Sequence, residues 1–454
     1  MIPHMKPSFT ILCLAAATCC WAEDNALTKP GFFTHENPGI QIAVSTENAE
    51  AQRLVNLGLK EYLYGSNERA GNFFEDALRE DAHCLLAHIG MMMIHPMRSE
   101  IYRNHLQQLN TGLEEAVLTP VEEWYVATFI QYLNGDLPGA AQAFRERAAT
   151  YRRDSMAACW DIVLNHYAGE KNETLIPRAD TLVNRLPDSP LAHFCRALIE
   201  ENNSPSDTAR KAARSASRLT EKSPHPGIEL LAGRLESRAG EWKQALKHFE
   251  TAAKCAPNQS ESFYTARLSI PAAWIQSGDK KLWMEALKYA KKLSDEAPGN
   301  TPETDAELLN YWEGKTLLLR MLVLQKTPPG GPAINMASRS CNAPEGHPLK
   351  LVQDCLVAAI QARSLAETGR ITTATTTFTK AEKLLSQLQR EGELSIPASG
   401  MSRTCYQRAF RACSGALYRA KVALYKESAS IWQPYLDDIL NTPEPRLLPP
   451  VLPH

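Results

Sequence analysis

The sequence predicts an all-α protein, folded as a right-handed superhelical solenoid of stacked antiparallel helix hairpins. In residues 51–84, apolar and small side chains recur at helical spacing in two runs, which Gly65-Ser66-Asn67 separates. The same offsets return in residues 226–259, and strand-like alternation is absent from the sequence. A chain of 454 residues is also too long for one ordinary core, whereas a solenoid grows by adding hairpins.

In the first hairpin, the size of each side chain matches its expected place between the two helices. Leu54 and Gly58 lie on one face of its first helix, and Ala70, Phe74 and Ala77 lie on one face of its second. Small residues are expected where two helix axes approach each other, and Phe74 is expected to wedge between them. This arrangement predicts a pair of tightly packed helices with an apolar side for the next hairpin.

Later segments repeat these positions. The matching residues are Gly233, Ala245, Phe249 and Ala252 in one unit, and Ala374, Phe378 and Ala381 in another. The pattern resembles the tetratricopeptide repeat, and the segment from Tyr64 to Gly90 resembles a group of bacterial tetratricopeptide-repeat proteins. The resemblance implies a concave surface, lined mainly by the first helix of each hairpin, that binds a partner.

The N-terminus predicts export. Lys6 precedes an apolar run over residues 9–20, and Ala22 ends the segment with a small residue. Residues 1–22 are therefore interpreted as a secretory signal peptide of a periplasmic or secreted protein. A lipoprotein, acylated at Cys19 or Cys20, is the alternative. No other stretch is long and apolar enough to predict a membrane span.

The rest of the chain divides by composition. We expect an extended lead-in over 23–47, tetratricopeptide-like repeats over 48–325, and an irregular loop over 326–348, where proline and glycine are frequent. A C-terminal repeat with capping helices is expected over 349–440, followed by a disordered tail over 441–454. Within the capping region, a helix is predicted over roughly 403–426 and a short helix at Trp432 and Tyr435.

Charge and cysteine content narrow the possible functions. The net charge is −2 and no basic run occurs, so nucleic-acid binding is not expected. The eight cysteines after the predicted signal peptide show no zinc-site spacing. Their number permits disulfides in an oxidising compartment without fixing a pairing, and small apolar packing residues are the favoured interpretation. Cys341 is set apart because it falls in the predicted polar loop, from which it could form a disulfide with a nearby helix.

The sequence predicts no catalytic centre. The motifs GxSxG, HExxH and GxGxxG and the P-loop are all missing, so the protein is not expected to be an enzyme or to hold a cofactor. Cys84, His88 and His95 are the nearest approach to a metal-ligand cluster. Packing of His88 in its helix is the favoured alternative, because it aligns with Leu54 of the first unit. An active site in the 326–348 loop is the remaining enzyme hypothesis.

The resemblance to tetratricopeptide repeats implies which positions face the groove. The candidate partner-binding residues are Gln52, Val55, Leu59, Tyr62, Tyr125, Phe129, Tyr132, Arg234, Arg238 and Arg363. Aromatic residues and arginine are favoured at binding hot spots. The alternative is that the apolar members pack against the following helices. A clamp for a terminal carboxylate is not supported, because Val55 and Leu59 occupy the places that Lys and Asn would take.

Together these features predict an exported, non-catalytic scaffold that binds a protein or peptide partner through its groove. The alternative is a carbohydrate- or small-ligand-binding protein of the cell envelope, because aromatic residues can hold a sugar ring.

Overall fold

A computed structural model describes residues 42, 44, 46, 48–95, 99–115, 117–201, 205–258, 260–277, 280–297, 305–325, 327–395, 403–431 and 433. These residues form α-helices and a short 3-10 helix, and no strand occurs among them. The predicted all-α class is confirmed. The predicted signal peptide, the disordered tail and the short helix at Trp432 and Tyr435 fall wholly or mainly outside the described residues, and only three positions of the lead-in are described.

The chain forms two compact units. Among the described residues, unit 1 contains those up to 200 and residues 211–220, and unit 2 contains those within 201–210 and within 221–433. The helices of unit 1 are α2 (Ala49–Leu63), α3 (Asn67–Glu80), α4 (Leu85–Ile94), α5 (Glu100–Glu115), α6 (Pro120–Leu133), α7 (Leu137–Thr150), α8 (Ser155–Tyr167), α9 (Asn172–Arg185) and α10 (Pro190–Leu198). Helix α11 (Asp207–Leu219) is divided between the two units.

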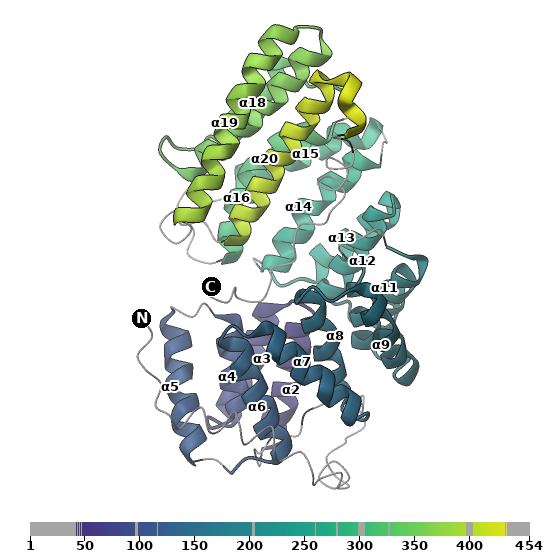
Figure 1. Cartoon of the computed structure of the whole chain (residues 1–454), viewed down its shortest axis with the longest axis vertical. Helices are drawn as coiled ribbons and strands as arrows, with labels where there is room; N and C mark the ends of the chain where they lie inside the picture. Colours follow the sequence, from purple (N-terminus) through teal and green to yellow (C-terminus); the bar gives the residue numbers. More distant parts are fainter. Residues whose placement is uncertain are drawn as a thin grey trace. The chain divides into compact units, whose positions relative to one another are not determined.

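Unit 2 continues the same construction. Its helices are α12 (Pro226–Arg238), α13 (Trp242–Cys255), α14 (Glu261–Gln276), α15 (Lys280–Glu296), α16 (Asp305–Leu324), α17 (Gly331–Cys341), α18 (Pro348–Glu367), α19 (Ile371–Ser395), α20 (Arg403–Leu424) and the 3-10 helix η2 (Lys426–Ser428). Most helices pack against the next one along the chain, and α18, α19 and α20 all pack against one another (Figure 1). The predicted stack of hairpins is thereby confirmed within each unit.

Local chemistry sets where the helices begin and end. The side chain of Thr119 accepts a hydrogen bond from the backbone N–H of Glu122, and Pro120 opens α6. The turns after α2 and α12 each place a glycine in the left-handed region, with φ of 75° at Gly65 and 78° at Gly240. The repeat thus extends from the helix faces to the turns.

The segment 326–348 is not wholly irregular, which corrects the prediction. Helix α17 occupies Gly331–Cys341 within it. Pro332 lies in the first turn, where a missing N–H is tolerated, and Asn342 ends the helix in the left-handed conformation with φ 42°. Cys341, expected in a polar loop, is instead buried against the core of unit 2.

Helix α5 was not predicted from the sequence. It packs against α4, and its buried residues include Tyr102 and Leu109, while most of its other side chains are partly or fully exposed. A helix with so few apolar anchors has a weak periodic signal. In the described part of the chain, no helix is both long and apolar enough to cross a bilayer.

Candidate binding pocket

The structure buries most of the apolar residues that were predicted to face a groove. Val55, Leu59, Tyr62, Tyr125, Phe129 and Tyr132 are all buried in unit 1. The ring of Tyr62 stacks on Trp160 with centroids 5.7 Å apart, and its hydroxyl lies 3.1 Å from that of Tyr132. Phe129 packs edge-on against the same tryptophan at 4.9 Å. Burial of these six side chains favours the packing alternative over an open groove.

The four polar candidates differ from one another. Gln52 is partly exposed on α2, and Arg238 is partly exposed near the end of α12. Arg363 is buried in α18, where its Nε donates to Glu367 Oε1 at 2.7 Å. Arg234, on α12, lines a pocket in unit 2. Arg234 is therefore a predicted residue that the structure places at this pocket.

This pocket has a volume of about 200 Å³ and lies among helices α12, α13, α14, α16 and α20. Its apolar lining residues include Leu230, Phe249, Leu268, Leu317 and Met321. These side chains belong to the hydrophobic clusters that hold the helices of unit 2 together, so packing fixes the floor of the pocket.

Four arginines line the same pocket: Arg234, Arg320, Arg408 and Arg411. Glu313 is the carboxylate among the lining residues. Its Oε2 lies 2.8 Å from Nη1 of Arg320 and 3.6 Å from Nη1 of Arg408. Arginine stays charged in proteins, and its planar head donates in fixed directions. The pair with Arg320 lies within α16 and the pair with Arg408 links α16 to α20, so Glu313 orients two of the guanidinium groups at the pocket.

Arg234 forms an ion pair with a residue that does not line the pocket. Its Nη2 lies 2.7 Å from Oε1 of Glu201. Near the C-terminal end of α16, Nη2 of Arg419 on α20 donates to the backbone oxygen of Gln325 at 2.8 Å, which keeps the two helices aligned there. The pocket thus combines a firm apolar floor with positioned cationic donors. A group with an apolar body and hydrogen-bond acceptors is its chemical complement.

Sequence reasoning missed Arg320, Arg408 and Glu313. Arg320 interrupts the apolar run Thr316–Val323, and a single charge inside such a run is a signal that could have identified it. Arg408 and Glu313 lie on helices far apart in sequence, so only the fold brings them together.

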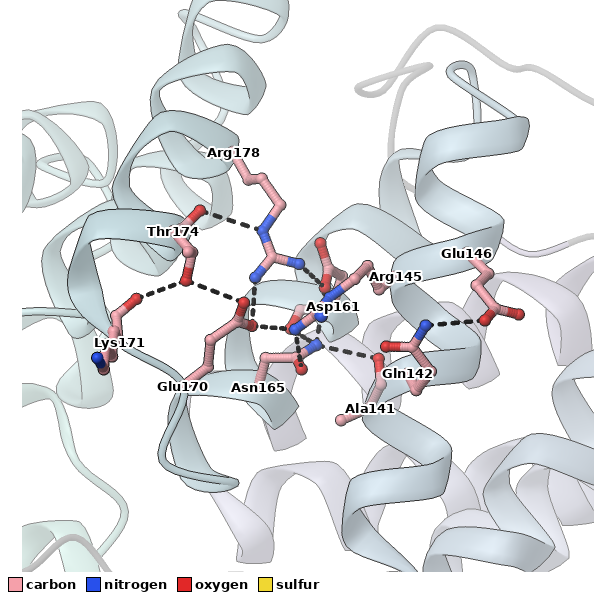
Figure 2. Close-up of polar contacts among 10 residues, drawn as sticks. All are labelled: Ala141, Gln142, Arg145, Glu146, Asp161, Asn165, Glu170, Lys171, Thr174 and Arg178. Carbon is pink, nitrogen blue, oxygen red and sulfur yellow. Dashed lines mark hydrogen bonds and ion pairs between the residues drawn. The ribbon is translucent and has the colours of Figure 1, made fainter.

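A second polar cluster lies in unit 1 and joins α7, α8 and α9 (Figure 2). Arg178 contacts both Asp161, at 2.6 Å, and Glu170. Arg145 contacts Glu170 and donates to Oδ1 of Asn165 at 2.8 Å. Burial raises the pKa of Asp161 to about 6, against the opposing effect of Arg178. Asp161 and Glu170 are each paired with an arginine, so we interpret the cluster as a structural link between the helices.

The residues considered for a metal site are arranged differently. His88 Nδ1 lies 2.9 Å from His105 Nδ1, and His88 Nε2 lies 3.0 Å from the backbone oxygen of Ala82. Within the described ranges, no group of three or more His, Cys, Asp or Glu side chains could hold a metal ion.

Comparisons with known proteins add little to this description. No protein-family model matches the chain, and no curated protein matches it. Among solved structures, the crystal structure of the yeast Tom70 is similar at 11% sequence identity and a TM-score of 0.29, covering 84% of this chain and 92% of that one. A likeness of this degree supports no inference about function. The fold and the pocket define a helical-hairpin protein with a candidate binding site in unit 2.

Proposed function

We propose that this chain is an exported, non-catalytic binding protein that holds a protein or peptide partner. The observation that carries the proposal is the pocket of unit 2, where arginines on α12, α16 and α20 meet an apolar floor. Arginine beside buried apolar surface is a common composition of binding hot spots. Export is supported by the sequence of residues 1–22.

The size of the pocket favours part of a larger partner. Sites for drug-sized ligands usually enclose roughly 300–1,000 Å³, whereas this pocket encloses about 200 Å³. One or two side chains of a peptide segment would fit such a space. Their apolar part would contact Leu317 and Met321, and acceptor atoms beside them would receive hydrogen bonds from Arg320 or Arg408.

A matched pair of variants tests the site. Arg320 lines the pocket and is paired with Glu313, whereas Arg267 on α14 lies outside its lining and is paired with Glu296. Both side chains are 21% exposed. Arg320→Ala and Arg267→Ala therefore each remove one positive charge and one ion pair from the same unit, although the carboxylate left behind is buried at Glu313 (5% exposed) and exposed at Glu296 (43% exposed). They differ in whether the lost guanidinium is at the pocket.

The experiment is affinity capture from an envelope extract with the tagged full chain and both variants, followed by quantitative mass spectrometry. We expect one protein to be captured by the wild type and by Arg267→Ala, and its recovery to fall about tenfold or more with Arg320→Ala, as for loss of a hot-spot residue. Equal recovery with the two variants, or no partner with the wild type, would contradict the proposal. Circular dichroism confirms that both variants are folded.

A small-ligand function is the second candidate, because Trp242 and Phe249 also line the pocket. Aromatic faces of this kind can stack on a sugar ring. A ligand that binds the native state raises the melting temperature by mass action. A saturable rise with a glycan, lost in Arg320→Ala and kept in Arg267→Ala, would favour this second candidate over a protein partner.

A further inference from the structure

Two cysteines of unit 1 meet across non-consecutive helices. Cys159 lies on α8 and Cys195 on α10, and both side chains are 0% exposed. The two helices pack against each other. Both cysteines are free thiols in the structure, and a hydrogen bond with the Cys195 thiol is the largest influence that raises the pKa of Cys159 well above its usual value, followed by burial.

Two cysteines of unit 2 repeat the arrangement. Cys355 lies on α18 and Cys413 on α20, again with 0% exposure, and these helices also pack directly (Figure 1). Sγ of Cys413 lies 3.8 Å from the backbone oxygen of Val352, one helical turn before Cys355. A hydrogen bond with the Cys355 thiol is the largest influence that raises the pKa of Cys413.

Both pairs relate their helices in the same way. Each joins a helix to the second helix after it, so that α9 and α19 lie in the chain enclosed by a pair. A covalent bond at either place would close a long loop, and a cross-link of that kind restricts the unfolded chain most.

We propose that Cys159 bonds to Cys195 and Cys355 to Cys413 in the mature protein, as two structural disulfides. Bond formation takes two thiols to one disulfide, with the release of two protons and two electrons. The electrons reduce an external disulfide, of a small thiol such as glutathione or of a thiol oxidoreductase, to two thiols. An oxidising compartment, as expected for an exported chain, supplies that oxidant.

The raised pKa values of Cys159 and Cys413 limit the stage of folding at which the two disulfides can form. A thiol must lose its proton to attack a disulfide, and the hydrogen bond with the neighbouring thiol, together with burial, suppresses this step for Cys159 and Cys413 in the folded chain. Oxidation is therefore expected during folding or through transient opening. This distinguishes structural disulfides from a redox switch, which needs an exposed thiol with a low pKa.

Cys84 and Cys341 provide the matched controls. Both are buried, and burial is the main influence that raises their pKa values to about 12; within the described part of the chain, no neighbouring thiol contributes to either shift. If burial alone led to oxidation, these two would be oxidised as well. The proposal requires them to remain thiols.

The test is a disulfide map of the full chain. The protein is refolded with a mixture of reduced and oxidised glutathione, free thiols are alkylated under denaturing conditions, and a proteolytic digest is analysed by mass spectrometry without reduction. We expect cross-linked peptides for Cys159–Cys195 and Cys355–Cys413, and alkylated Cys84 and Cys341. Alkylation of all four paired cysteines, or cross-links in other combinations, would overturn the proposal.

A stability measurement gives a second, independent readout. Reduction of the oxidised wild type should lower the melting temperature by about 10 °C, as expected for loss of a loop-closing bond in a unit of this size. The double variant Cys159→Ser/Cys195→Ser should lose the part of this shift that belongs to unit 1. An unchanged melting temperature on reduction would contradict a structural role.

Discussion

Gly58 faces the ring of Phe74 so closely that a Cβ atom at position 58 would lie 2.5 Å from Cε1 of the phenylalanine. In unit 2, Gly233 faces Phe249 with the same 2.5 Å approach. Two hairpins far apart in the chain therefore pack their helices in the same way. A glycine on the first helix lets a phenylalanine from the second lie flat against the backbone.

Gly58→Ala is expected to destabilise unit 1. Alanine favours a helix over glycine by about 1 kcal/mol, but the added methyl group must displace the buried ring of Phe74, and overpacking of this kind costs roughly 1–3 kcal/mol. The ring cannot retreat easily, because the backbone at Gly90 also approaches it: a Cβ atom there would lie 2.5 Å from the end of the Phe74 ring. Urea unfolding should show a lower midpoint, and Gly233→Ala should act likewise in unit 2.

The control for this prediction is Gly331→Ala. Gly331 opens α17, and a Cβ there would meet nothing within 4 Å. Its substitution should leave the stability unchanged or slightly raised. A Gly58→Ala protein as stable as Gly331→Ala would show that the close packing on Phe74 is not a constraint.

The sequence predicted this part of the fold because it depends on local spacing. The pattern that places Gly58 and Phe74 on facing helix surfaces repeats with equal offsets in the chain, so a single sequence is enough to detect it. Helix α17 was missed because proline and glycine were read as excluding regular structure. Pro332 instead lies in a first turn, where proline is compatible with a helix.

The candidate site was less predictable for a physical reason. Arg234 was identified by its repeat position, but Arg408 and Glu313 reach the pocket only through the packing of α16 and α20. The resemblance to repeat proteins also implied a groove role for Tyr125, whereas its side chain is buried. Spacing along one helix identifies which residues share a face, but not whether another helix covers that face.

Tyr125→Phe is expected to lower stability. The Tyr125 hydroxyl donates to Oδ1 of Asp154 at 2.6 Å, and Nε of Arg147 donates to Oδ2 of the same carboxylate at 2.6 Å. Removing the hydroxyl takes a donor from a buried charged group, which costs roughly 1–3 kcal/mol. Thermal unfolding monitored by circular dichroism measures the loss.

Tyr102→Phe is the matched control for this hydroxyl. Tyr102 is also buried, and its hydroxyl bonds to none of the described residues. We expect its substitution to change stability by about 0.5 kcal/mol or less. If Tyr125→Phe were equally silent, the hydroxyl would contribute nothing measurable to the stability of the Asp154 cluster.

Arg178→Met should be more damaging at high pH than at low pH. Arg178 stabilises the charged form of Asp161, whose pKa is already raised by burial to about 6. Without the arginine this pKa rises further. The folded variant then binds more protons than the wild type above pH 6, so its deficit in stability grows as the pH increases through that range.

The comparison uses urea unfolding of the wild type and Arg178→Met at pH 5 and pH 8. The deficit at pH 8 should be roughly 1–3 kcal/mol, the discounted range for a partly exposed partner of a buried charge, and distinctly smaller at pH 5. Arg79→Met is the control, because Arg79 pairs with Glu75 on an exposed surface. An equal deficit at both pH values would contradict the coupling of Arg178 to Asp161.

The contact between His88 and His105 should make α4 and α5 sensitive to acid. The backbone oxygen of Ala82 can only accept, so His88 carries its proton on Nε2 and its Nδ1 accepts from His105. Burial is the largest cause that lowers the pKa of His88, and burial together with the charge of His88 lowers that of His105 to about 4. Both rings are therefore neutral in the folded protein at neutral pH.

The lowered pKa values of both histidines determine how stability changes with pH. A histidine with a lowered pKa in the folded state takes up its proton first in the unfolded chain, so stability is complete above about pH 6.5 and is lost as the pH falls toward about 4. Hydrogen exchange of peptides from α4 and α5 reports this locally. We expect protection to decrease between pH 7 and pH 5, after correction for the intrinsic exchange rate, and to decrease less in His105→Gln. His83 is exposed, and its charge is only a lesser cause of the lowered pKa of His88, so His83→Gln should weaken the response less than His105→Gln does. The same response in all three proteins would show that the histidine pair is not the sensor.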